Sequence, residues 1–216
     1  MPALPYFGTY SRFTAENKSE GGFLLGADCI VGDRFDIEFT TDDEGRTLPW
    51  VSNRFGRRVG TIDDPSTVEQ LLLCRARKFH ISALLVAVYY SDQPKPGNYW
   101  GEVAIMAYDD AHASDFDAFR THVGKKIANG ARISVDLGAQ GIDQVIESHG
   151  SWIPNTRQPK PQLEPGTVML KDSITLSEKL VEGSRNKNVG CFIGGWAFLI
   201  VMAVLVVAVV RSCTGA

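Results

Sequence analysis

Residues 189–210 are a run of 22 amino acids with no charged side chain, and Arg211 ends the run. At about 1.5 Å per residue, a helix of this length spans the roughly 30 Å hydrocarbon core of a bilayer. A helix buried in a soluble protein would carry a polar stripe, and this segment has none. We therefore expect one transmembrane helix at 189–210, followed by a short tail at 211–216.

Basic residues flank the two ends of this segment unequally. Lys179, Arg185 and Lys187 precede it, whereas Arg211 is the single charge that follows it. Lys and Arg accumulate on the cytoplasmic side of a membrane helix. The pattern predicts a single-pass, tail-anchored protein whose large N-terminal region is cytoplasmic, with the lipid bilayer as its first partner.

Small residues recur in the first half of the same segment. Gly190 and Gly194 form a small-xxx-small pair. This spacing lets two membrane helices approach closely and predicts a homodimer through this face, although glycine is also common in membrane helices for other reasons. The absence of ionisable side chains within the segment argues against transport or proton relay, so we expect an anchor.

The region before the segment is mildly acidic. Arg211 is one of the 22 Lys and Arg of the chain, so the other 21 face 25 Asp and Glu. This balance argues against general nucleic-acid binding, which needs a concentrated basic surface. The four cysteines are Cys29, Cys74, Cys191 and Cys213, with no CxxC spacing, so neither a disulfide framework nor a zinc site is expected. We expect no cofactor.

Strand signals dominate residues 23–108. Residues 23–31 are mostly apolar, and residues 35–41 alternate between apolar and polar side chains. Residues 48–62 are typical of a hairpin that turns at 54–56, and two long apolar runs follow at 81–90 and 99–108. These patterns predict a largely antiparallel sheet.

Helix signals separate these strands and follow them. Asp64 is positioned to cap a helix that begins at Pro65 and ends near Lys78. Ser114 is a candidate N-cap for a second helix that Gly130 ends, and residues 141–148 are a candidate for a short third one. The order of elements predicts an α+β fold: a small, largely antiparallel sheet or barrel with two to three helices, plus the C-terminal transmembrane helix.

Composition divides the chain into five parts. Three prolines and a glycine fall within residues 155–166, which predicts a linker. We therefore expect a lead-in segment at 1–21, a soluble domain at 22–154, and a linker and juxtamembrane segment at 155–188. The transmembrane helix and the tail complete the chain.

Residues 51–62 read Val-Ser-Asn-Arg-Phe-Gly-Arg-Arg-Val-Gly-Thr-Ile and precede the helix with Leu71 and Leu72 and the strand from Ile81. This stretch resembles the HIRAN family over residues 22–108. The resemblance implies a small β-barrel with a strand, a glycine turn, a Val-Gly pair and a helix. It also implies binding of single-stranded DNA ends, because relatives in that family bind them.

Three arginines in this hairpin are the candidate ligand-binding residues: Arg54, Arg57 and Arg58. Guanidinium groups at one turn can hold a phosphate or a nucleic-acid strand, or face acidic lipid headgroups. The alternative is an ordinary solvated surface.

Asp109, Asp115 and His112 are the candidate groups for catalysis or metal binding, within a stretch rich in acids. Proximity in sequence does not make ligands converge, and acids near a helix N-terminus are also favoured by the helix dipole. No nucleophile elbow, phosphate loop or dinucleotide fingerprint is present. We therefore expect no metal site and name no catalytic residue, and whether the chain is an enzyme stays open.

Three functions remain at this stage. The first is a non-catalytic interaction or adaptor module for a protein partner at the cytoplasmic face of a membrane. The second is a HIRAN-like domain that binds nucleic acid or a phosphate ligand. The third is a hydrolase or transferase that uses acids such as Asp109 and Asp115.

Overall fold

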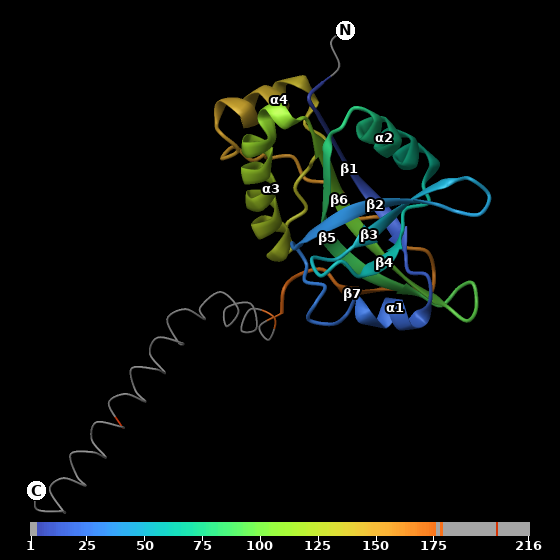
Figure 1. The fold of residues 1–216 in the computed structure, drawn as a ribbon. Coiled ribbons are helices and arrows are strands. Elements are labelled where there is room, and N and C mark those ends of the chain that lie inside the picture. The colour runs from blue at the N-terminus through green and yellow to red at the C-terminus, as the bar shows by residue number, and fades with distance from the viewer. Residues whose placement is uncertain (1–3, 176–177, 179–201, 203–216) are drawn as a thin grey trace, which may run out of the picture. The chain divides into compact units, whose positions relative to one another are not determined.

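Six antiparallel strands close into a barrel, with helices packed around it (Figure 1). The computed structural model describes residues 4–175, Glu178 and Met202. The chain divides into two units, 1–174 and 175–216, and the first contains all the elements described below. In chain order these are β1 (Tyr6–Thr14), α1 (Lys18–Phe23), β2 (Arg34–Thr41), β3 (Thr47–Ser52), β4 (Arg58–Thr61), α2 (Pro65–Ala76), β5 (His80–Ser91), β6 (Asn98–Tyr108), a 3-10 turn (Asp110–His112), α3 (Ala113–Ala128), α4 (Gly138–Glu147) and β7 (Thr167–Lys171).

The order of strands around the barrel is β2-β3-β4-β1-β6-β5. A short ladder between β2 and β5, from Arg34 opposite Leu84 to Asp36 opposite Ser82, closes it. The second half of β5 pairs with β7 instead, from Val88 opposite Lys171 to Ser91 opposite Thr167. β5 therefore belongs to the barrel at one end and carries an added edge strand at the other.

Phe13 stands at the centre of the barrel interior and is fully buried. Two glycines leave room for its ring: a Cβ on Gly101 would lie 2.2 Å from the ring, and one on Gly60 would lie 2.8 Å from it. Buried apolar side chains from all six barrel strands pack into the same cluster, including Phe35, Ile37, Val51, Val59, Leu85, Val103 and Ile105.

A second apolar cluster lies between the outer face of the barrel and the helices α3 and α4. Phe116, Phe119, Val123 and Ile127 recur at helical spacing along α3 and face strand residues such as Tyr6 and Met106. The ring of Tyr6 stacks on Phe116 at 4.7 Å, and its hydroxyl donates to the carbonyl of Val135 at 2.9 Å. These helices cover one end of this face, and the other end is left to polar groups.

The α+β class and the antiparallel sheet are confirmed, and the hairpin, the two long strands and the three predicted helices are present. Asp64 caps α2 by accepting from the backbone N–H of Thr67 at 2.8 Å. The helix α3 begins at Ala113, one residue before the predicted cap Ser114, and has no side-chain cap. The described residues form four α-helices, against the two to three expected.

The structure differs from the expected domain limits at both ends. Residues 6–14 of the expected lead-in form β1, which pairs with β6 along its whole length. Residues 167–171 of the expected linker form β7. The predicted strand at 23–31 is wrong: α1 ends at Phe23, and tight turns follow because the N–H of Gly26 bonds to Phe23 O and that of Cys29 bonds to Gly26 O.

The predicted transmembrane helix lies outside the described residues, apart from Met202, and so do Gly190, Gly194 and the tail at 211–216. Among the residues that the structure describes, no helix is both long enough and apolar enough to cross a bilayer. The membrane segment therefore stays a prediction from the sequence.

Phe13→Ala tests whether β1 belongs to the core. The substitution leaves a cavity at a fully buried site, so we expect it to lower the free energy of unfolding by about 3–5 kcal/mol. Leu73→Ala, at an exposed position of α2, is the control and should change it by less than about 0.5 kcal/mol. Urea unfolding of the full chain in detergent, followed by circular dichroism, measures both. A loss for Phe13→Ala no larger than the control would contradict the core position of β1.

Candidate functional site

The turn between β3 and β4 is built around Asn53, whose side chain is buried. Its amide oxygen accepts from the backbone N–H of Phe55 at 3.1 Å and of Arg57 at 3.0 Å, and its amide nitrogen donates to Asp28 O at 3.2 Å. Asn53 thus fixes the turn internally and fastens it to the loop that follows α1.

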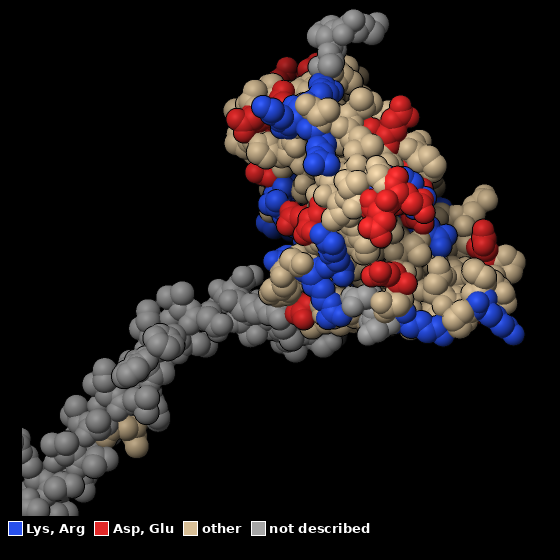
Figure 2. Space-filling model, turned by 45° about the vertical axis from the view of Figure 1, so that its right-hand side comes forward, with Lys and Arg blue, Asp and Glu red and all other residues tan. Residues whose placement is uncertain are grey.

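The three candidate arginines lie on or beside this turn. Arg54 pairs with Asp33 at 3.1 Å, and Arg58 pairs with Glu38 on β2 at 3.1 Å. The guanidinium of Arg57 lies over the ring of Phe23, 3.8 Å from its centre. The structure brings the three residues to one region, but acidic partners offset the charge of two of them. On the face drawn in Figure 2, Lys and Arg are interspersed with Asp and Glu and form no continuous basic groove.

Lys171, the last residue of β7, is buried against the loop after α1. Its ammonium donates to Cys29 O at 2.7 Å and to Gly26 O at 3.4 Å. Cys29 is a buried free thiol whose pKa is raised to about 12, chiefly because burial penalises the thiolate. We assign Cys29 and Lys171 a structural role, which fastens β7 to this loop.

A polar cavity of about 320 Å³ lies on the outer face of the sheet, at the end that α3 and α4 leave uncovered. Side chains of β1, β6 and β5 form its floor, and the segment before β7 forms its wall. Its lining residues are Tyr10, Ser11, Arg12, Ser91, Gln93, Pro94, Asn98, Trp100, Glu102, Pro161, Gln162, Glu164 and Thr167.

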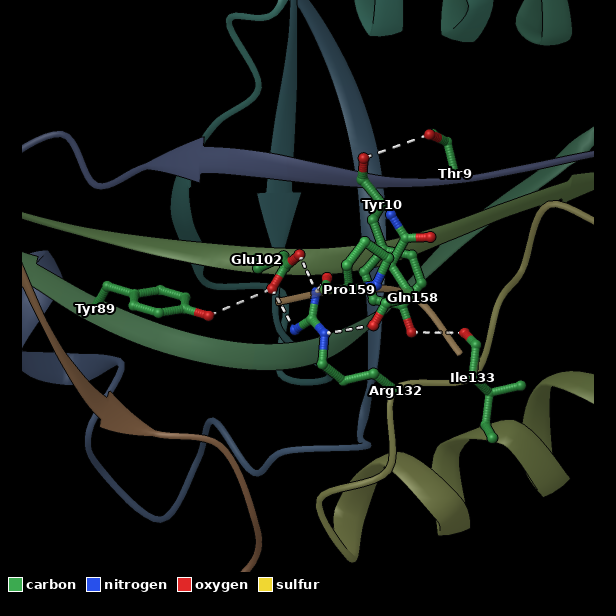
Figure 3. Close-up of polar contacts among 8 residues, drawn as sticks. All are labelled: Thr9, Tyr10, Tyr89, Glu102, Arg132, Ile133, Gln158 and Pro159. Atoms are coloured by element: carbon green, nitrogen blue, oxygen red, sulfur yellow. Dashed lines mark hydrogen bonds and ion pairs between the residues drawn. The ribbon is translucent and has the colours of Figure 1, made fainter. Parts of the chain in front are cut away.

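An ion pair between Glu102 and Arg132 organises this region (Figure 3). Arg132 donates to both carboxylate oxygens of Glu102, at 2.6 and 2.7 Å, and both side chains are only 10 % exposed. Its remaining N–H groups donate to Gln158 O at 3.2 Å and Pro159 O at 3.0 Å. Arg132 therefore joins the barrel strand β6 to the segment that crosses over it.

Aromatic side chains surround this pair and are held neutral. The pKa of Tyr89 is raised to about 12 by burial and by the nearby carboxylate of Glu102, to which its hydroxyl donates at 3.5 Å. Burial also raises the pKa of Tyr10, against the opposing effect of Arg132. For Arg132 itself, burial disfavours the charge, but the hydrogen bonds and the charge of Glu102 outweigh it, so the guanidinium pKa is raised.

Trp100 lines the cavity together with Glu102. It stacks on Tyr89 at 3.9 Å, Arg12 lies over its other face at 4.4 Å, and its indole N–H donates to Ser91 Oγ at 3.0 Å. The amide oxygen of Asn98, also in the lining, is buried and accepts no hydrogen bond from the described residues. The cavity thus offers an aromatic wall, one guanidinium and an unmet acceptor, a set suited to holding a polar group that carries an N–H donor.

The acidic stretch does not assemble into a site among the described residues. Asp109 accepts from the imidazole of His112 at 2.9 Å, whereas Asp115 lies 3.1 Å from His149. Asp117 bonds to Tyr108 and to Arg120. Across residues 4–175, no group of three or more His, Cys, Asp or Glu is placed to hold a metal ion, and the lining of the polar cavity does not include these acids.

Sequence reasoning missed the Glu102–Arg132 pair. One signal was available: Glu102 is the only charged residue within the long apolar strand 99–108. A charge in such a strand implies a buried partner. The partner is 30 positions away in sequence, and only the fold places it opposite Glu102.

Comparisons with known proteins give no match: no family model fits the chain, and neither a curated protein nor a solved structure resembles it significantly.

Breaking the buried ion pair is expected to destabilise the domain strongly. Glu102→Leu leaves a buried guanidinium without its carboxylate, so the free energy of unfolding should fall by about 3–5 kcal/mol. The double variant Glu102→Leu with Arg132→Met removes both charges and should lose less than the sum of the single variants. Urea unfolding of the four proteins in this cycle measures the coupling. Additive losses would contradict a direct interaction.

The buried tyrosines predict a loss of stability at alkaline pH. Burial raises the pKa of Tyr89 and that of Tyr108 to about 12, the latter also through its hydrogen bond to Asp117. An unfolded tyrosine ionises near pH 10, so the unfolded state releases these protons first. The stabilisation that these neutral buried hydroxyls give the folded state is therefore fully present below pH 10 and is lost as pH rises towards 12. Tyr89→Phe should therefore flatten the fall in unfolding free energy between these pH values. An unchanged slope would contradict the burial of a neutral hydroxyl.

Proposed function

We propose that this chain is a single-pass, C-terminally anchored membrane protein whose barrel domain is a non-catalytic interaction module at the cytoplasmic face. The observation that carries this proposal is the uncharged segment 189–210. Its length matches the hydrocarbon core of a bilayer, and its basic flank lies on the side of the domain.

The distance between the domain and the anchor supports a tethered module. The barrel unit ends at Ile174, and 14 residues, 175–188, separate it from the segment. A chain of 14 residues has a fully extended limit of about 50 Å. The anchor therefore holds the domain near the bilayer and raises its effective concentration for partners there.

The polar cavity is the proposed contact for a protein partner. Glu102 and Arg132 already pair with each other, and Arg132 also donates to the carbonyls of residues 158 and 159, so this ion pair has no free group for a ligand. What remains for a ligand is Trp100 with Arg12 and the acceptor of Asn98, which suits recognition of a polar peptide group rather than acid–base chemistry.

Membrane fractionation tests the anchor. We expect the full chain to sediment with membranes and to resist alkaline carbonate, and a variant that ends at Asn188 to stay in the supernatant. Leu199→Lys with Val204→Lys should also release the chain, because each lysine near the helix centre costs about 2.5–3.5 kcal/mol of insertion. Leu199→Ala with Val204→Ala is the matched control and should stay in the membrane. Release of the full chain by carbonate would contradict the proposal.

The second candidate is a HIRAN-like domain that binds nucleic acid or a phosphate ligand. Two observations favour it: the barrel is small and antiparallel, and Arg54 and Arg57 lie at one exposed turn. The pairs of Arg54 with Asp33 and of Arg58 with Glu38 weigh against it, because binding a phosphate would require breaking them.

Fluorescence anisotropy with a single-stranded oligonucleotide at low salt separates the two functions. If this domain binds nucleic acid, replacing Arg54, Arg57 and Arg58 by alanine should weaken binding and reduce the slope of log K against log salt by about 2. Arg46→Ala, in the exposed turn between β2 and β3, is the control. The interaction-module proposal predicts no binding by the unchanged chain.

A further inference from the structure

Exposed apolar side chains gather at one end of the barrel. Val168, Met169 and Leu170 are consecutive in β7 and are 38 to 52 % exposed. Phe55, in the turn between β3 and β4, is 60 % exposed. Leu25, in the loop after α1, is also exposed. An isolated exposed apolar residue needs no explanation, but several in neighbouring segments do.

Hydrogen bonds hold these positions together as one surface. In the stretch 26–29, Gly26 O and Cys29 O accept hydrogen bonds from Lys171 of β7. In the same stretch, Asp28 O accepts a hydrogen bond from Asn53 in the turn between β3 and β4. Leu25 is adjacent to this stretch. We name the surface formed by Leu25, Phe55, Val168 and Leu170 the apolar end of the barrel.

β7 is an edge strand among the described residues. It pairs with β5 on one side, and no described strand pairs with its other side. β7 is only five residues long, its ladder with β5 is bulged opposite Val88 and Tyr89, and its one charge, Lys171, points inward. These features disfavour pairing with a further strand, so the exposed apolar side chains, and not the backbone edge, are what a covering surface would explain.

Basic residues surround the apolar end. Arg57 follows Phe55 by two positions, whereas Arg54 is paired with Asp33. Lys125 and Lys126 are exposed in the last turn of α3, and that helix end meets the chain beyond β7, because the N–H of Ile174 donates to Ala128 O at 2.9 Å. Apolar side chains ringed by Lys and Arg match the interface of an anionic bilayer.

The barrel unit ends at Ile174, three residues after β7 (Figure 1). Leu170 precedes the predicted membrane segment by only 18 intervening residues. With the tether dimensions given above, the apolar end lies within reach of the bilayer at all times. By contrast, α2 is at the opposite end of the barrel (Figure 1).

We propose that the apolar end of the barrel lies on the membrane, with Phe55, Leu25, Val168 and Leu170 at the interface and Arg57, Lys125 and Lys126 facing anionic lipid headgroups. This inference rests on the proposed membrane anchor. It adds an orientation to the tether: the domain lies against the lipid through this end.

Site-directed spin labelling of the full chain in vesicles with about 30 % anionic lipid tests this orientation. Labels are placed at Leu170→Cys and Phe55→Cys, with Leu73→Cys on α2 as the matched exposed control. Cys191 and Cys213 are replaced by serine, whereas Cys29 and Cys74 are buried and stay unlabelled. Flotation of the vesicles reports the anchor separately.

We expect the chain to float and the labels at 170 and 55 to collide about threefold less often with a water-soluble nickel chelate than the label at 73, while staying accessible to oxygen. Flotation with equal chelate access at all three positions would overturn the orientation and leave the anchor intact. A chain that fails to float would overturn the anchor and the orientation together. Shielding of 170 and 55 in detergent as well as in vesicles would identify a protein contact and overturn the lipid assignment. Equal shielding on uncharged vesicles would overturn the choice of anionic lipid.

Discussion

The β2–β5 ladder is the contact on which the rest of this architecture depends. Only three residue pairs make it, from Arg34 opposite Leu84 to Asp36 opposite Ser82, yet it turns an open sheet into a barrel. Closure removes two exposed edges and encloses Phe13 with its glycine neighbours. Because β5 leaves β2 after this ladder, its second half is free to receive β7. The cavity wall and the apolar end of the barrel both follow from that division of β5.

Two buried cations then attach the irregular segments to the barrel. Arg132 binds Glu102 and the carbonyls of Gln158 and Pro159, so the segment after α4 is held across β6. Lys171 binds carbonyls of the loop after α1. Neither cation faces bulk water, and each replaces its hydration with fixed acceptors. The two attachments shape the polar cavity and the apolar end, which adjoin each other at β7, where Thr167 lines the cavity and Val168 belongs to the apolar end.

Alternation and capping in the sequence were enough to predict much of the barrel. Residues 35–41 and the hairpin at 48–62 alternate, and Asp64 with Pro65 predicts where α2 begins. β1 was missed because its aromatic residues do not alternate regularly, and because it is stabilised by pairing with β6, about 90 positions away. β7 was missed because it follows a proline-rich segment and owes its existence to β5. The candidate arginines were predicted as a group, but their acidic partners Asp33 and Glu38 are brought to them only by the fold.

Protease protection in sealed microsomes tests the central claim, the anchoring of the barrel at the cytoplasmic face, most directly. The full chain carries one epitope before residue 1 and another after Ala216, and intact vesicles are treated with protease before and after permeabilisation. The account predicts that the first epitope is lost at once, while the second survives on a small fragment that contains residues 189–216 until the membrane is opened. Protection of the whole barrel, or loss of both epitopes from intact vesicles, would contradict it.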